Sequence, residues 1–194
     1  MFTGIIRHLG FFVGYRQNRR TMIIEAPDLP GPLTEGESVA VNGVCLTVET
    51  HEASRLNFHL SLETLGKTNL GELRPRDLVN LELPLTIQSF LSGHLLTGHV
   101  DGTGVVKRVE RRDAGLRLRI SFPPELEAFL VPKGSVGVNG VSLTIASLLP
   151  SHFEVELIPL TLEKTNLGRL RPGDRVNLEG DIIGKYVYNY LSRK

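Results

Sequence analysis

The chain has 194 residues, a length that suits one large domain or two small ones. Its composition, with 41% hydrophobic and 22% charged residues, is ordinary for a globular protein. The formal net charge is only +1 and the basic residues are spread along the sequence, which excludes an electrostatic case for nucleic acid as a partner. A single cysteine cannot form an internal disulfide, so the sequence favours a reducing, cytoplasmic compartment.

The amino-terminal segment is apolar but interrupted. Its sequence, MFTGIIRHLGFFVGYRQ, contains Arg7 and His8 and shows no small-residue cleavage site. We therefore expect neither a signal peptide nor a membrane span in this segment.

The strongest pattern in the sequence is an internal repeat. Residues 38–82 align with residues 135–179 without a gap, and more than half of the aligned positions are identical. After a small shift, FTGIIRHLG from Phe2 also aligns with LTGHVDGTG from Leu96. Two copies are too few for a solenoid, so the repeat predicts tandem domains.

Each copy reads as β-structure. Short alternating runs are separated by Gly, Pro, Asn and Asp at spacings of about ten residues, which is the pattern of a small barrel or sandwich. The tail differs, because residues 182–191 carry apolar side chains at helical spacing. These side chains are Ile182, Ile183, Tyr186, Val187, Tyr190 and Leu191. We expect this helix to pack on another surface, either of its own chain or of a second chain.

The dipeptide Asn42-Gly43, flanked by apolar alternation, predicts a hairpin with a type I′ turn. The turn fixes a register that places Val39, Val41, Val44 and Leu46 on one face and Ser38, Ala40, Cys45 and Thr47 on the other. The second copy repeats this small face with Ser135, Gly137, Ser142 and Thr144. A solvent-facing sheet would carry charges. The uncharged positions indicate a docked ligand, a second barrel, or a tight turn that needs small neighbours.

The two copies differ at positions that could carry chemistry. Cys45 stands where the second copy has Ser142, and His99 stands where the first copy has Ile5. A single histidine is more often structural than catalytic, but a glycine-rich stretch with an apolar sister position favours a functional role for His99. A metal site at His94 and His99 is not expected, because residues five apart do not converge on one face. No nucleotide-binding loop or nucleophile elbow occurs.

Taken together, these motifs resemble those of the α-chain type of riboflavin synthase over the whole chain. The likeness rests on MFTGII, SVAVNGVCLTV, ETLGKTNLG, GHLLTGHVDG, GVSLTI, LIPLTLEKTNLG and RVNLEGDIIGKYV. It implies an all-β fold of two tandem six-stranded Greek-key barrels, residues 1–93 and 94–180. A carboxy-terminal α-helix, residues 181–194, would join three chains into a homotrimer.

The implied reaction is a dismutation without metal or cofactor. Two molecules of 6,7-dimethyl-8-ribityllumazine exchange a four-carbon unit and give riboflavin and 5-amino-6-(D-ribitylamino)uracil. In this family the first barrel of one chain faces the second barrel of a neighbour, so that two similar pockets hold the two molecules. The sequence leaves open which pocket holds the four-carbon donor and whether a lumazine synthase capsid encloses the trimer.

The resemblance also implies the site residues. The first pocket would use Gly4, Ile5, Ile6, Cys45, Leu46, Thr47, His59, Leu60, Ser61, Leu62, Glu63 and Thr64. The second would use Gly98, His99, Val100, Lys133, Ser142, Leu143, Thr144, Ile158, Pro159, Leu160, Thr161, Leu162 and Glu163. Phe2 would shape the site from the amino terminus. The positions with an implied chemical role are Ser38, Cys45, His99, Thr144 and Asp181.

The chain departs from the usual family pattern at Gly66, Leu160 and Ser92. The alternative function is that of the family's non-catalytic branch, the lumazine or flavin carriers related to fluorescent proteins, in which the second half is eroded. Here both halves keep their motifs, and Cys45 and His99 are present, which favours the enzyme. A purely structural β module would leave the uncharged faces and the TGHVDG motif unexplained.

Overall fold

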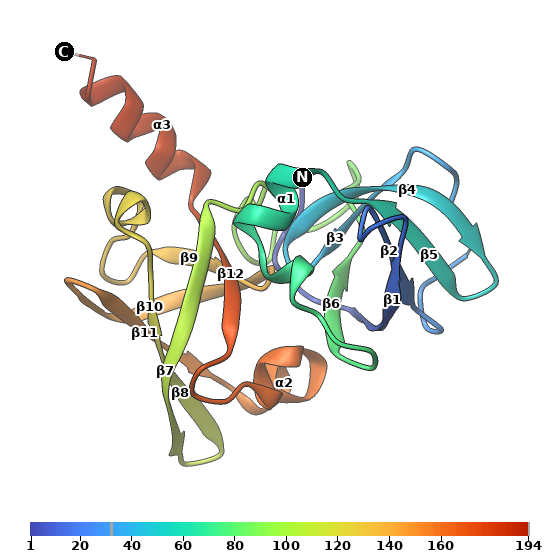
Figure 1. Cartoon of the computed structure of the whole chain (residues 1–194). Helices are drawn as coiled ribbons and strands as arrows, with labels where there is room; N and C mark the ends of the chain where they lie inside the picture. Colours follow the sequence, from blue (N-terminus) through green and yellow to red (C-terminus); the bar gives the residue numbers. More distant parts are fainter. Residues whose placement is uncertain (32, 194) are drawn as a thin grey trace.

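The computed structural model of the protein describes residues 1–31 and 33–193. Two closed six-stranded antiparallel barrels lie side by side (Figure 1). The strands of the first barrel are β1 (His8–Arg16), β2 (Thr21–Glu25), β3 (Ser38–Val41), β4 (Val44–Glu52), β5 (Arg55–His59) and β6 (Leu78–Glu82). Those of the second are β7 (Gly102–Arg112), β8 (Gly115–Ser121), β9 (Ser135–Val138), β10 (Val141–Leu149), β11 (His152–Leu157) and β12 (Arg175–Gly180).

Both barrels have the same strand order. Around the first barrel the order is β1-β2-β5-β4-β3-β6, and the corresponding strands of the second follow the same order. Because β2 pairs with β5 and not with β3, the connection between β2 and β3 crosses to a non-adjacent strand, as in a Greek key. The predicted pair of tandem six-stranded barrels is confirmed.

Short helices interrupt the β-structure in both copies, which the sequence analysis did not predict. They are α1 (Leu62–Lys67), η1 (Asn69–Gly71), η2 (Pro124–Phe129), α2 (Pro159–Lys164) and η3 (Asn166–Arg169). The hydroxyl of Ser61 caps α1 by accepting a hydrogen bond from the N–H of Thr64 at 3.0 Å. Pro159 occupies the first turn of α2, where its missing N–H costs nothing.

The predicted hairpin is confirmed in both copies. Asn42 and Gly43 both have positive φ, as a type I′ turn requires. The register pairs Ala40 with Cys45 and Ser38 with Thr47, as expected. The predicted inward set (Val39, Val41, Val44 and Leu46) is buried in the first barrel. The two hairpin turns lie against each other. A Cβ on Gly43 would be only 2.6 Å from the backbone nitrogen of Gly140, at the equivalent turn of the second barrel.

Six buried asparagines link the two barrels. The Nδ2 group of Asn80 donates to the carbonyl oxygen of Asn139 at 2.9 Å. At the repeated position, Nδ2 of Asn177 donates to the carbonyl oxygen of Asn42, also at 2.9 Å. The set is Asn42, Asn69, Asn80, Asn139, Asn166 and Asn177. Because a buried amide without a partner is costly, this network fixes the position of one barrel against the other.

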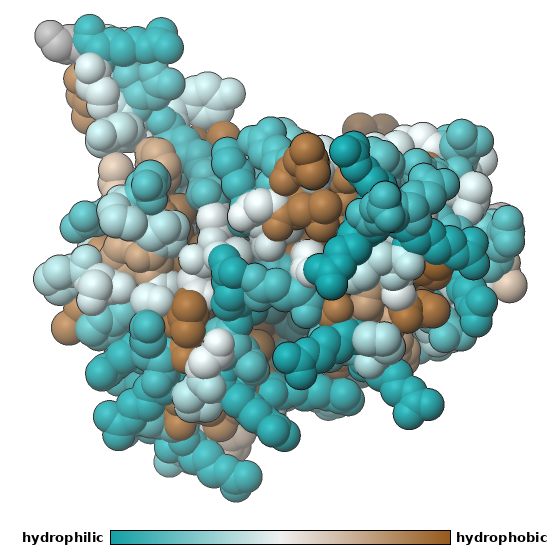
Figure 2. Space-filling view, in the orientation of Figure 1, coloured by the Kyte–Doolittle hydropathy of each residue, from teal (hydrophilic) through white to brown (hydrophobic). Residues whose placement is uncertain are grey.

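The predicted tail helix is α3 (Ile182–Leu191), which projects away from the second barrel (Figures 1 and 2). Asp181 caps it by accepting a hydrogen bond from the N–H of Ile183. Tyr188 packs edge-on against Phe129, with 5.6 Å between ring centroids. The apolar stripe is largely exposed, with Tyr186 73% accessible. Among the described residues, no helix is long and apolar enough to cross a membrane.

Candidate active site

The two segments that precede the barrels cross each other. Phe2 and Leu96 form an antiparallel bridge through two backbone hydrogen bonds of 2.8 and 3.1 Å. Beyond this crossing, the N–H of Ser142 donates to the carbonyl oxygen of Gly4 at 2.9 Å. The N–H of Cys45 donates to the carbonyl oxygen of Gly98 at the same distance. The segment before each barrel therefore lies on the hairpin of the other barrel.

Side-chain packing shows the same exchange. Ile6 belongs to the hydrophobic core of the second barrel. Val100 packs against the core of the first. Phe2 and Leu96 are buried together with Ala40 on the small face of the first hairpin. The docked ligand or barrel expected on this face is thus in part the chain's own crossing segments.

This exchange corrects the predicted grouping of the site residues. Residues 4–6 were expected beside residues 45–47, and residues 98–100 beside residues 142–144. The structure instead places residues 98–100 against residue 45 and residues 4–6 against residue 142. The sequence repeat shows which segments are equivalent, but it does not show which of two similar barrels each segment contacts.

A buried carboxylate holds each crossing segment in place. Oε1 of Glu82 accepts hydrogen bonds from the N–H and the hydroxyl of Thr3, both at 2.7 Å, and Oε2 accepts from the N–H of Gly4 at 3.0 Å. In the second repeat, Oε1 of Glu179 accepts hydrogen bonds from the N–H of Thr97 at 2.7 Å and from its hydroxyl at 2.6 Å. Oε2 accepts from the N–H of Gly98 at 3.1 Å. Burial raises the pKa of both carboxyls, and these hydrogen bonds oppose that shift.

With this regrouping, the residues predicted for the first-barrel site are 45–47, 59–64 and 98–100. A Cβ on Gly98, whose φ is +80°, would lie 2.8 Å from the backbone nitrogen of Cys45, so only glycine fits here. His99 follows and is exposed. Thr47 is exposed and pairs with Ser38 across the hairpin. The register thus places Ser38 and Cys45 on one face of the first hairpin, and His99 directly follows the glycine that contacts Cys45.

The far edge of the first-barrel site runs from β5 into α1. His59 is exposed, with Nδ1 3.7 Å from Oε1 of Glu49. Leu60 is fully buried, whereas Leu62 is 71% exposed. Glu63 forms an exposed ion pair with Lys67. The exposed Leu62 gives this predicted segment an apolar surface.

The residues predicted for the second-barrel site are then 4–6, 142–144 and 158–163. Thr144 is exposed and pairs with Ser135. Ile158 and Leu160, at the start of α2, are 60% and 59% exposed. The backbone N–H of Lys133 donates to the carbonyl oxygen of Ile145, the residue after Thr144. The remaining predicted residues are Pro159, Thr161, Leu162 and Glu163 on α2 and Leu143, which is buried.

His94 contacts the predicted site residue Ser142, a contact that the sequence did not predict. It is only 8% exposed, and its Nδ1 lies 2.7 Å from Oγ of Ser142. Burial lowers the pKa of His94, and the nearby charge of Asp181 acts in the opposite direction. Among the described residues, no cluster of three or more His, Cys, Asp or Glu side chains could hold a metal ion.

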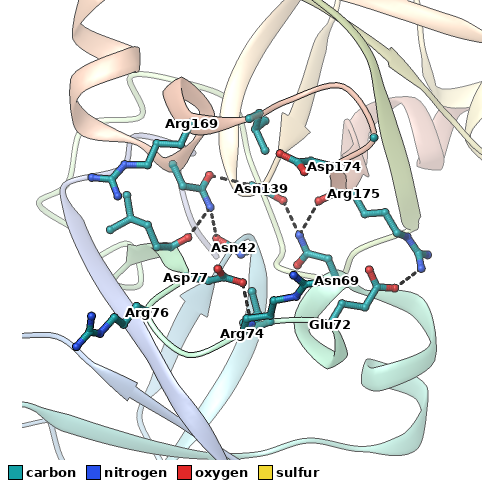
Figure 3. A pocket seen from close by; sticks show the side chains of 15 residues that line it. Asn42, Asn69, Glu72, Arg74, Arg76, Asp77, Asn139, Arg169, Asp174 and Arg175 are labelled. Carbon is teal, nitrogen blue, oxygen red and sulfur yellow. Dashed lines mark hydrogen bonds and ion pairs between the residues drawn. The ribbon is translucent and has the colours of Figure 1, made fainter.

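A cavity of about 590 Å³ lies elsewhere, between the barrels (Figure 3). Arg74, Arg169 and Arg175 line it together with Asn69 and Asp77. None of its lining residues belongs to the predicted site. The predicted site residues instead lie on the two hairpins, on the crossing segments and on α1 and α2 with the residues before them.

Comparison with known families accounts for this paired arrangement. The family model of the lumazine binding domain matches residues 3–84 and again residues 97–181. The chain therefore belongs to the lumazine-binding domain family, as a tandem pair of such domains.

Its curated relatives over the full length are riboflavin synthases. The chain is 37% identical to that of Actinobacillus pleuropneumoniae, covering all of this chain and 91% of the relative. It is 40% identical to that of Mycobacterium tuberculosis, covering 96% of each chain. It is 39% identical to that of Escherichia coli, covering all of this chain and 92% of the relative.

Solved structures show the same fold. The crystal structure of LumP complexed with 6,7-dimethyl-8-(1'-D-ribityl) lumazine has a TM-score of 0.80 and 26% identity, covering 92% of this chain and 98% of that one. LumP complexed with riboflavin has a TM-score of 0.82 and 27% identity, covering 93% and 99%.

Proposed function

We propose that the chain catalyses the riboflavin synthase reaction. Two molecules of 6,7-dimethyl-8-ribityllumazine exchange a four-carbon unit, and the products are riboflavin and 5-amino-6-(D-ribitylamino)uracil. The observation that carries this proposal is the full-length similarity to riboflavin synthases, in both of the repeated domains. As the resemblance to riboflavin synthase implies, the proposed reaction uses no metal or cofactor.

The duplicated half-sites suit a reaction between two copies of one molecule. Each proposed half-site combines a small, uncharged hairpin face with the crossing segment that contacts it. Two such faces opposite each other would hold two lumazines in a reactive orientation. Orientation alone can lower a barrier by roughly 7–11 kcal/mol.

We propose that the two faces meet between chains of a homotrimer, the first-barrel site of one chain against the second-barrel site of a neighbour. The exposed side chains of Leu62, Ile158 and Leu160 support this, because a bound ligand and a facing barrel would cover them. The exposed stripe of α3 provides a surface for joining the chains. We propose that residues 1–93 and 94–180 form the two lumazine-binding domains and that residues 181–194 form the oligomerisation helix. We also propose a cytoplasmic location. A lumazine synthase capsid is a further candidate partner.

The proposed chemical roles follow from position. The N–H of Cys45 binds the carbonyl oxygen of Gly98, the residue before His99. Cys45 and His99 both differ from their sister positions, Ser142 and Ile5, so they would distinguish the first-barrel site. Ser38 and Thr144 lie on the small hairpin faces. Asp181 begins α3, beside the second barrel. A thiol is a good nucleophile and a histidine moves protons near neutral pH, as the loss of a proton from a lumazine methyl group requires.

The competing function is that of a carrier that binds a lumazine or flavin without converting it. The fold similarity to LumP fits either function. Purified protein mixed with the lumazine alone distinguishes them. We expect riboflavin absorbance to grow with time in the absence of any additive. A lumazine that stays bound and unchanged would favour the carrier.

A further inference from the structure

The contact between His94 and Ser142 belongs to the second barrel only. The Nδ1 atom of His94 lies 2.7 Å from the hydroxyl oxygen of Ser142. In the first barrel, Cys45 occupies the sister position of Ser142. Among the described residues, no side chain forms a hydrogen bond with the sulfur of Cys45. The linker between the barrels therefore gives Ser142 a partner that Cys45 lacks.

The surroundings of the other ring nitrogen decide which nitrogen of His94 carries the proton. Nε2 is buried and has no hydrogen-bond partner within residues 1–31 and 33–193. A buried N–H without a partner is rare and costly, whereas an unpaired acceptor is tolerated better. The favoured neutral tautomer therefore has its hydrogen on Nδ1, and Nε2 is the bare acceptor.

The protonated imidazolium is disfavoured for the same reason. It would place an N–H at Nε2 in the same buried position, and burial already holds the pKa of His94 below its ordinary value. The Asp181 carboxylate favours the charged form but does not outweigh burial. A neutral His94 with Nδ1–H then donates to Oγ of Ser142.

This direction of the hydrogen bond determines what Ser142 offers to a ligand. A serine hydroxyl can donate one hydrogen bond and accept others. If its oxygen accepts from His94, its hydrogen is free to point elsewhere. The structure shows no second partner for this hydroxyl among the described residues, and the Ser142 side chain is partly exposed on the second-barrel site.

We infer, building on the proposed function, that His94 is a positioning residue. As the Nδ1–H tautomer it donates to Ser142 and turns the serine hydroxyl hydrogen toward a carbonyl or ring-nitrogen acceptor of the lumazine in the second-barrel site. The two half-sites then differ in kind. The second presents an oriented hydrogen-bond donor where the first presents a thiol.

The tautomer can be measured directly, whether or not the protein makes riboflavin. In protein labelled with ¹⁵N-histidine, two-bond nitrogen–proton couplings distinguish the Nδ1–H form from the Nε2–H form, and the His94→Asn variant assigns the signals. We expect His94 in the Nδ1–H form at neutral pH. An Nε2–H tautomer or an imidazolium would overturn the inference, because Nε2 would then carry the hydrogen.

Kinetics test the effect on the lumazine reaction. His94→Leu keeps a buried apolar side chain without a donor, whereas His94→Asn keeps an N–H at the position of Nδ1. We expect His94→Leu to lower kcat about tenfold, the size of one lost oriented hydrogen bond, with KM changed less than about twofold. His94→Asn should restore most of the rate. Equal losses in both variants would mean that His94 only fills space.

Two controls separate positioning from packing. In a Ser142→Ala background, His94→Leu should cause no further loss, because its target hydroxyl is already absent; a loss that persists there would contradict the inference. His152 is a matched histidine, since its Nε2 is also buried without a partner and its Nδ1 contacts Ser151 at 3.3 Å, outside the site. His152→Leu should leave kcat unchanged. If the wild-type protein makes no riboflavin, the proposed function fails, while the tautomer measurement still decides the inference.

Discussion

The backbone N–H of Cys45 donates to the carbonyl oxygen of Gly98 at 2.9 Å, which joins the first barrel to the segment that leads into the second. In the same way, the N–H of Ser142 donates to the carbonyl oxygen of Gly4 at 2.9 Å, which joins the second barrel to the segment that leads into the first. Each proposed half-site therefore combines residues of both repeats. A change in one crossing segment should affect the chemistry of the other barrel.

The crossing glycines should be intolerant of side chains. A Cβ on Gly4, whose φ is +75°, would lie 2.6 Å from the Cβ of Ser142, and a Cβ on Gly98 would lie 2.4 Å from the Cβ of Cys45. We expect Gly98→Ala and Gly4→Ala each to lower the free energy of unfolding by about 1–3 kcal/mol in urea titrations. Gly66→Ala is the control, because nothing lies within 4 Å of its Cβ position in α1. A Gly98→Ala variant as stable as Gly66→Ala would refute this close contact.

Cys45→Ser should leave the fold intact, because the second barrel already holds a serine at this position. We expect the unfolding free energy to change by less than about 1 kcal/mol and turnover to fall about tenfold or more, within the range of positioned catalytic groups. The assay is riboflavin formation at saturating lumazine. A Cys45→Ser turnover within about twofold of wild type would indicate that the cysteine only fills space on that face.

His99→Gln tests proton transfer in the first-barrel site. Glutamine keeps a polar side chain but cannot carry a proton near neutral pH. Because proton transfer acts on turnover rather than on binding, we expect kcat to fall about 10²-fold, with lumazine affinity by fluorescence titration nearly unchanged. Ile5→Gln is the matched control at the sister position on the other crossing segment. Equal losses of rate and affinity in His99→Gln would indicate a binding role.

Stability should depend on pH through the two buried carboxyls. Burial raises the pKa of Glu82 in the folded state, so between the ordinary glutamate pKa and this raised value the folded chain binds more protons than the unfolded chain. The contribution of Glu82 to stability is therefore fully present at low pH and declines as pH rises through that window. Urea titrations from pH 4 to 8 should show the decline in wild type but less of it in Glu82→Gln. Glu179→Gln should repeat the result. A wild-type advantage that grows with pH would mean that the hydrogen bonds outweigh burial.

The tail should control assembly. Val187 lies on the exposed stripe of α3, whereas Asn189 is exposed beside it. A charge within an apolar contact is costly to bury. We expect Val187→Asp to shift the mass in light scattering from trimer to smaller species and to reduce activity, while Asn189→Asp keeps the trimer. If both variants keep the mass of the trimer, the barrels rather than α3 hold the chains together.

The hairpins and their register could be predicted because their causes are local. Asn42-Gly43 requires positive φ at both positions, and the alternation of apolar residues around it sets the faces. The helix at residues 182–191 could be predicted from its spacing for the same reason. The signals of α1 and α2, a Ser61 cap and a Pro159 in the first turn, were present in the sequence but are short and stand between strong strand patterns.

The exchange of the crossing segments could not be predicted, because it depends on long-range contacts. Residues 2–6 and 96–100 are similar in sequence, and the two barrels that could receive them are similar as well. Only the folded chain shows that Ile6 enters the second core and Val100 the first. His94 was missed for a related reason, since its partner Ser142 is distant in sequence.

The most direct test of the account is the product ratio from lumazine alone. Purified protein is incubated with 6,7-dimethyl-8-ribityllumazine as the only organic reactant, and the three compounds are quantified by chromatography over the time course. A dismutation between two facing half-sites predicts one riboflavin and one 5-amino-6-(D-ribitylamino)uracil for every two lumazines consumed. Riboflavin without an equal amount of the uracil product, or lumazine that is bound but not consumed, would contradict it.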